Sequence, residues 1–61
     1  MNKGTIIDVV NLGTIVLVIL SDGTKIPFDH RMFHDFAEAN DFDLRNKVCE
    51  YNPKSGMVYT G

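Results

Sequence analysis

The side chains of this chain that could carry out chemistry are few, and two histidines come first. His30 and His34 are four residues apart, a spacing that on a helix can place two imidazoles on one metal ion. Arg31 follows the first histidine, where a zinc protease needs a glutamate. The single cysteine, Cys49, is distant in the sequence. We therefore expect a solvated histidine pair, with no metal site and no cofactor.

Cys49 is the candidate nucleophile, and its surroundings do not activate it. No histidine or aspartate lies at a motif spacing from Cys49 that would mark a catalytic base. The neighbouring Glu50 would raise the pKa of its thiol. The chain also contains no glycine-rich phosphate loop and no serine-centred elbow, and 61 residues offer little volume for a substrate pocket. We expect a packing cysteine in a protein that is not an enzyme.

Aromatic rings and cations form a third set, which suits nucleic-acid binding rather than catalysis. Rings can stack on bases while nearby cations attract phosphates. The candidate contacts are Lys25, Phe28, His30, Lys47 and Tyr59. The formal net charge of −2 argues against strong binding, because phosphate contact is usually accompanied by a basic surplus.

Length and composition limit the structure that must position these residues. Sixty-one residues, 44% of them hydrophobic, make a single domain over residues 1–61 with one small core. A lone cysteine cannot form an intrachain disulfide, which fits a reducing compartment. The sequence shows neither a secretory leader pattern nor the roughly 20 apolar residues of a membrane span. We expect a cytoplasmic protein that does not bind membranes.

Hydrophobic patterning predicts five strands and one helix. The strands are expected over residues 5–10, 14–21, 25–28, 45–51 and 57–60, and the helix over residues 30–39. Three strands, a helix and two further strands are the element order of the OB fold. We therefore expect an all-β fold, a five-stranded OB-type Greek-key barrel with one short helix between strands 3 and 4; a small SH3-like barrel is the alternative.

Local signals fix both ends of the expected helix. Asp29 can accept hydrogen bonds from the free backbone donors of the first turn. Phe28 and Phe33 occupy the two positions of a hydrophobic staple. Asn40 can end the helix in a left-handed conformation.

The turn at Asp22-Gly23 assigns the faces of the second strand. If it is a two-residue turn, Ile15, Leu17 and Ile19 face the core, and the residues between them face outward. The predicted outward apolar patch consists of Ile6, Val10, Val16, Val18 and Leu20. An exposed patch of this kind indicates an interface with a protein partner or with a second copy, unless loops or the N-terminus cover it.

Several segments resemble cold-shock domains and follow the order of that family. They are Lys3–Val10, Ser21-Asp22-Gly23, Ile26–His30 and Phe42–Val48. The ending, residues 47–53 followed by residues 54–59, is similar to S1-type domains such as bacterial translation initiation factor one. The resemblance spans nearly the whole chain and implies an OB fold that contacts single-stranded nucleic acid, with Phe28 and His30 as counterparts of a third-strand Phe and His. The second strand departs from that family, because it is aliphatic where cold-shock domains carry stacking aromatics.

Two hypotheses of function follow. The first is a non-catalytic binding module that makes a weak contact with single-stranded RNA or DNA in the manner of cold-shock and S1 domains. The alternative is a small protein-interaction or regulatory module that docks through the outward aliphatic patch on a larger complex or on itself. The resemblance favours the first, whereas the negative charge and the missing aromatics favour the second.

Overall fold

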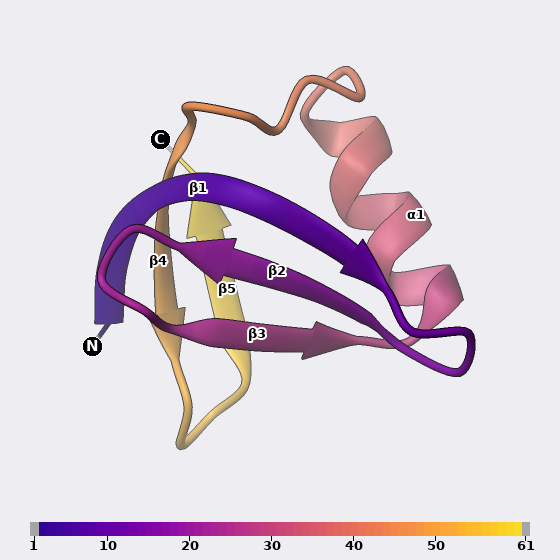
Figure 1. Ribbon diagram of the computed structural model, residues 1–61, viewed down its shortest axis with the longest axis horizontal. Helices are drawn as coiled ribbons and strands as arrows, with labels where there is room; N and C mark the ends of the chain where they lie inside the picture. Colours follow the sequence, from indigo (N-terminus) through magenta and orange to yellow (C-terminus); the bar gives the residue numbers. More distant parts are fainter. Residues whose placement is uncertain (1, 61) are drawn as a thin grey trace.

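The computed structural model describes residues 2–60 as one antiparallel sheet with a single helix (Figure 1). The elements are β1 (Asn2–Asn11), β2 (Val16–Leu20), β3 (Lys25–Phe28), α1 (His30–Ala39), β4 (Val48–Asn52) and β5 (Met57–Thr60). The expected all-β architecture with one helix is confirmed, and β3, α1 and β5 have the predicted bounds. β4 begins later than predicted, because Asn46 takes a left-handed φ of 69° and Lys47 N–H bonds back to the Leu44 carbonyl.

The long strand β1 joins two hairpins into one sheet of order β3-β2-β1-β4-β5. Its first residues pair with β4, and the rest pair with β2. At the changeover, Ile6 N–H donates to the carbonyl of Lys47, and its own carbonyl accepts from Asn46 N–H. Figure 1 shows β1 curving so that the β2–β3 and β4–β5 hairpins run in different directions. Within residues 2–60 the end strands β3 and β5 are not paired with each other, so the sheet is open rather than a closed barrel.

The close approach of β1 to the β2–β3 turn requires a glycine at position 4. A Cβ added to Gly4 would lie 2.9 Å from Ser21 Oγ and 3.3 Å from the backbone nitrogen of Asp22. Ser21 Oγ is held there because it accepts a hydrogen bond from Thr5 N–H at 3.0 Å. β1 then shifts its register to β2 between Ile6 and Asp8, which increases the local bend of the strand.

The β2–β3 turn has three residues rather than the predicted two. Gly23 N–H donates to the Leu20 carbonyl, and Leu20 N–H donates to the Thr24 carbonyl. Gly23 alone takes a positive φ of 92°, which matches a type I turn closed by a left-handed glycine. Hydrogen bonds from the side chain and backbone of Thr24 lower the pKa of Asp22. The extra loop residue pairs Val18 with Ile26 and so moves every side chain of β2 to the opposite face.

The predicted outward patch is therefore wrong in four of its five residues. The buried members are Ile6, Val16, Val18 and Leu20. Val10 alone stays on the outer face, where it pairs with Leu17 and is half-buried. Ile7 lies where the register of β1 shifts, and its side chain is 51% exposed.

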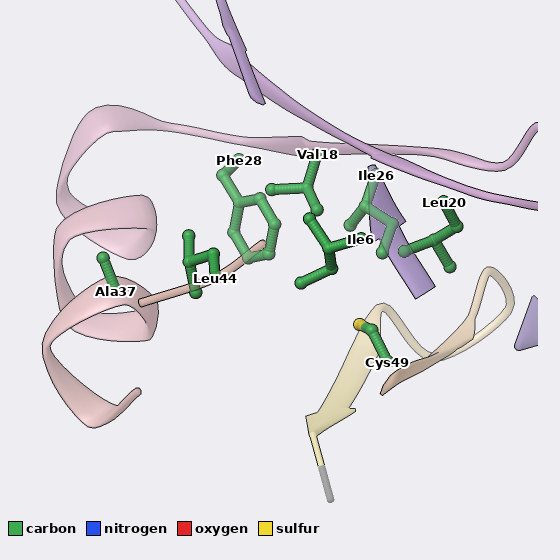
Figure 2. Close-up of a cluster of buried hydrophobic side chains, with 8 residues drawn as sticks. All are labelled: Ile6, Val18, Leu20, Ile26, Phe28, Ala37, Leu44 and Cys49. Carbon is green, nitrogen blue, oxygen red and sulfur yellow. The ribbon is translucent and has the colours of Figure 1, made fainter. Parts of the chain in front are cut away.

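The core lies between the sheet and the helix, with contributions from every part of the chain (Figure 2). Its buried side chains are Ile6, Val18, Leu20, Ile26, Phe28, Ala37, Leu44 and Cys49. The Phe28 ring stacks on Phe36 at a centroid distance of 5.0 Å and meets Phe33 edge-on at 6.1 Å. The second contact confirms the predicted staple.

Asp29 caps α1 as predicted, since its carboxylate accepts from Met32 N–H at 2.7 Å. The other end differs from expectation, because Asn40 has a φ of −111° and the left-handed residues are Asp41 and Phe42. Asn40 instead uses its side-chain amide to bond the Phe36 carbonyl at 2.8 Å. Over the described residues, no helix has the length and apolar character needed to cross a membrane.

Candidate binding surface

The five residues predicted to bind nucleic acid lie in four different places. Phe28 is only 4% exposed and forms part of the core, so its ring cannot receive a base. His30 is exposed, but its Nε2–H donates to the carbonyl of Gly13 and ties the β1–β2 loop to the start of α1. Lys25 is exposed on the outer face of β3. Lys47 directly precedes β4, and Tyr59 lies on β5.

The outer face of the β4–β5 hairpin carries a row of functional side chains. Strand pairing sets Lys3 of β1 beside Glu50 of β4, and Glu50 beside Tyr59 of β5. Lys3 Nζ lies 3.4 Å from Glu50 Oε1, and Tyr59 is 48% exposed. A hollow of about 170 Å³ opens here, lined by Lys3, Val48, Glu50, Tyr59 and Thr60.

A second hollow, of about 400 Å³, continues this surface toward the end of α1. It is lined by Asn40, Asn46, Lys47, Val48 and Thr60. Both hollows share Val48 and Thr60, and we call them together the β4–β5 groove. Thr60 Oγ donates to Asn40 Oδ1 at 2.8 Å, which fixes the end of β5 to the end of the helix. The groove therefore includes a fixed contact between β5 and the end of α1.

The groove combines one ring with a small surplus of cations. Tyr59 offers a flat apolar face, and Lys3 and Lys47 offer two positive charges against the single carboxylate of Glu50. Asn46 adds an amide that can donate and accept hydrogen bonds. This arrangement suits a planar ligand bearing a negative charge.

Sequence reasoning missed most of the residues that line the groove. The alternation of β4 and β5 could have placed Val48, Glu50 and Tyr59 on one face. Lys3 and Thr60 could not be assigned in this way, because they reach the groove only through the pairing of β1 with β4 and the bond to Asn40. Neither contact leaves a local signal in the sequence.

A second surface lies on the outer face of β1, β2 and β3. Strand pairing aligns Val10, Leu17 and Pro27 in one row, and Asp8, Ile19 and Lys25 in the next. The aliphatic members are half-buried, and Pro27 is exposed. Asp8 Oδ1 lies 3.6 Å from a guanidinium nitrogen of Arg45 at the margin of this face. An outward aliphatic face thus exists, with Leu17 and Ile19 in place of the predicted residues.

The two histidines have separate partners. His30 bonds Gly13, whereas His34 Nδ1 lies 3.7 Å from Glu38 and its ring meets Phe42 at 5.8 Å. In the part of the chain that the structure describes, no group of three or more His, Cys, Asp or Glu residues is placed to hold a metal ion.

Comparison with other proteins adds no further constraint. No protein-family model, curated protein or solved structure matches this chain. The function is therefore inferred from the residues on the surfaces of this chain.

Cys49 is fully buried against the core, as expected of a packing cysteine. Burial raises the pKa of its thiol above the usual value of 9.0, and the nearby Glu50 carboxylate adds to the shift. A thiol of this kind is a poor nucleophile at neutral pH.

The raised pKa of Cys49 predicts a loss of stability in alkali. Above pH 9.0 the thiol ionises in the unfolded chain but stays protonated in the folded one, so proton release favours unfolding. We expect the free energy of unfolding to fall as pH rises from about 9 toward the folded pKa. Urea unfolding at several pH values measures this, with Cys49→Ala as the control for titrating lysines and tyrosines. An equally steep alkaline loss in Cys49→Ala contradicts the prediction.

Proposed function

We propose that this chain is a non-catalytic OB-type module that makes a weak contact with single-stranded RNA or DNA through the β4–β5 groove. The central position of β1, paired with both β2 and β4, and the place of α1 between β3 and β4 support an OB fold. OB barrels can be partly open, which is compatible with the separate edges of β3 and β5.

The observation that carries the proposal is the half-exposed ring of Tyr59 in a hollow that Lys3 also lines, with Lys47 lining the adjoining hollow. An aromatic ring stacks on any base and contributes about 1–3 kcal/mol per base. Lys3 and Lys47 supply attraction for the flanking phosphates. With one ring and two lysines in a protein of net charge −2, the contact is weak and falls with salt.

The resemblance to cold-shock and S1-type domains supports the same class of ligand. Cold-shock domains place aromatics on their second strand, whereas the outer face of β2 here carries Leu17 and Ile19. Tyr59 on β5 is a half-exposed ring in a hollow that Lys3 also lines. We therefore place the contact on the β4–β5 hairpin instead of on β2.

Fluorescence anisotropy with labelled oligo(dT) and oligo(U) tests the proposal. We expect binding at about 20 mM salt that weakens markedly at about 150 mM. Tyr59→Leu keeps an apolar side chain but removes the ring, and it should weaken binding about tenfold, since 1.4 kcal/mol is a factor of ten. Tyr59→Phe keeps the ring and should bind as the wild type does.

The Phe and Leu variants separate base stacking from general apolar contact. Equal affinities of Tyr59→Phe and Tyr59→Leu would show that the ring does not stack on a base. No anisotropy change at low salt for either oligonucleotide excludes nucleic-acid binding altogether.

A second candidate function is docking on a larger protein complex through the outer face of β1, β2 and β3. The row of Val10, Leu17 and Pro27 favours it, because a contiguous apolar face of this kind marks interaction sites. Lys25 and the Asp8–Arg45 ion pair supply polar groups at its margin. The variant that tests this candidate is Leu17→Asp.

A further inference from the structure

The two ends of the open sheet differ in how their free edges are protected. β3 contains Pro27, which has no N–H to offer a further strand, and the exposed cation Lys25. Proline and lysine are the residues that natural sheets use to block pairing at an edge. The β3 edge is therefore a poor template for another strand.

The β5 edge has none of this protection. Its four residues, Met57, Val58, Tyr59 and Thr60, include neither a proline nor a charge. β-Branched and aromatic residues of this kind favour a sheet environment. Within residues 2–60, β5 pairs with β4 alone and forms one end of the strand order (Figure 1). The β5 edge is thus open to a further strand.

We propose that two copies of this chain associate by antiparallel pairing of their β5 edges across a two-fold axis. Antiparallel pairing of a strand with itself is self-complementary, so one patch serves both copies. Opposed residues in such a pair lie on the same face of the sheet. A register centred on Val58 satisfies this condition and uses the strand from Met57 to Tyr59.

This register builds an apolar centre on the outer face. Met57 is 49% exposed and Tyr59 is 48% exposed, and each lies opposite the other residue type in the second copy. A thioether beside an aromatic ring is a favourable contact. On the inner face, Val58 packs against the core and meets its own counterpart, which extends the core across the axis.

The surroundings of this centre are polar and neutral. Tyr59 is flanked on β4 by Glu50, which pairs with Lys3 at 3.4 Å. Like charges therefore do not meet at the axis, and a polar rim encloses the apolar centre, as in known interfaces. Four residues per copy bury less than the roughly 1,200 Å² of a stable interface, so the dimer is weak. The association does not depend on nucleic-acid binding.

Sedimentation equilibrium across about 10 µM to about 1 mM protein, without oligonucleotide, tests the proposal. The mean mass should rise from 6.9 kDa toward twice that value. Met57→Lys places a charge at the edge and should weaken association at least about tenfold. Ile7→Lys is the matched control, because Ile7 is 51% exposed, much as Met57 is, but lies in the interior strand β1. It should associate as the wild type does.

Oligomeric state and oligonucleotide affinity are separate measurements, so failure of the dimer proposal can be told apart from failure of the nucleic-acid proposal. Nuclear Overhauser contacts from the Met57 methyl to the Tyr59 ring of a differently labelled copy would establish the edge pairing directly. A wild type that stays monomeric up to about 1 mM overturns the proposal. So does a dimer that Met57→Lys leaves intact, since that dimer must use another surface.

Discussion

We expect aspartate in place of Val18 to unfold the protein, and aspartate in place of the adjacent Leu17 to leave it folded. Val18 is fully buried, and its side chain is part of the core shown in Figure 2. A carboxylate there has no partner and costs several kcal/mol. A domain of 61 residues has only about 3–9 kcal/mol of stability, at roughly 0.05–0.15 kcal/mol per residue. Leu17 faces outward, where its carboxylate replacement stays hydrated.

Circular dichroism and urea unfolding measure this pair of variants. The expected result is a folded Leu17→Asp with a modest loss of stability and an unfolded Val18→Asp. The reverse result would establish the two-residue turn at Asp22-Gly23, because that register places Leu17 in the core and Val18 on the surface. The two residues are neighbours of similar hydrophobicity, so propensity cannot explain a difference between them.

The folded Leu17→Asp variant also tests docking through the outer face of β1, β2 and β3. An interface centred on this row loses affinity when a charge enters it. Unchanged solubility and partner retention in this variant would remove the second candidate function. The β5 edge and the β4–β5 groove are distant in the strand order from Leu17, so their assays are unaffected.

The sequence predicts this fold well wherever the information is local. Asp29, Phe28 and Phe33 define the start of α1 through a cap and a staple, and both contacts are present. The change from period-two to helical patterning after Phe28 gives the end of β3 and the start of α1 correctly. These signals depend on residues within one turn of each other.

The pairing register of β2 cannot be predicted from the sequence, because two turn geometries at the same residues have similar energies. Asp22-Gly23 suits a two-residue turn, and it equally suits the last two positions of a three-residue loop closed by Gly23. The choice depends on which face of β2 packs better, which is a property of the whole core. A loop that is one residue longer therefore exchanges the buried and exposed faces of β2.

The candidate site was predictable only in part, for the same reason. Tyr59 and Lys47 could be chosen by residue type, and they lie at the groove. Lys3 joins them through its pairing with Glu50, a residue 47 positions later in the chain. Residue type also points to Phe28 and His30, but the Phe28 ring is packed in the core and His30 bonds the Gly13 carbonyl.

Phe28→Ala should unfold or nearly unfold the protein, and Phe28→Leu should weaken it without changing nucleic-acid binding. The ring is 4% exposed and contacts both Phe33 and Phe36, so it holds α1 against the sheet. Removing a buried phenylalanine side chain costs about 3–5 kcal/mol, which approaches the whole stability of a domain this small. Leucine fills most of the volume and should cost about 1–2 kcal/mol.

The leucine variant decides between a structural and a binding role for Phe28. If the ring stacks on a base, Phe28→Leu loses oligonucleotide affinity about tenfold while its unfolding midpoint changes little. The buried position predicts the opposite pair of results: a lower midpoint in urea and an unchanged affinity. Tyr59→Leu, measured beside it, should show an unchanged midpoint and a lower affinity, because that ring is half-exposed. Together the two substitutions separate the ring that supports the fold from the ring that is free to meet a ligand.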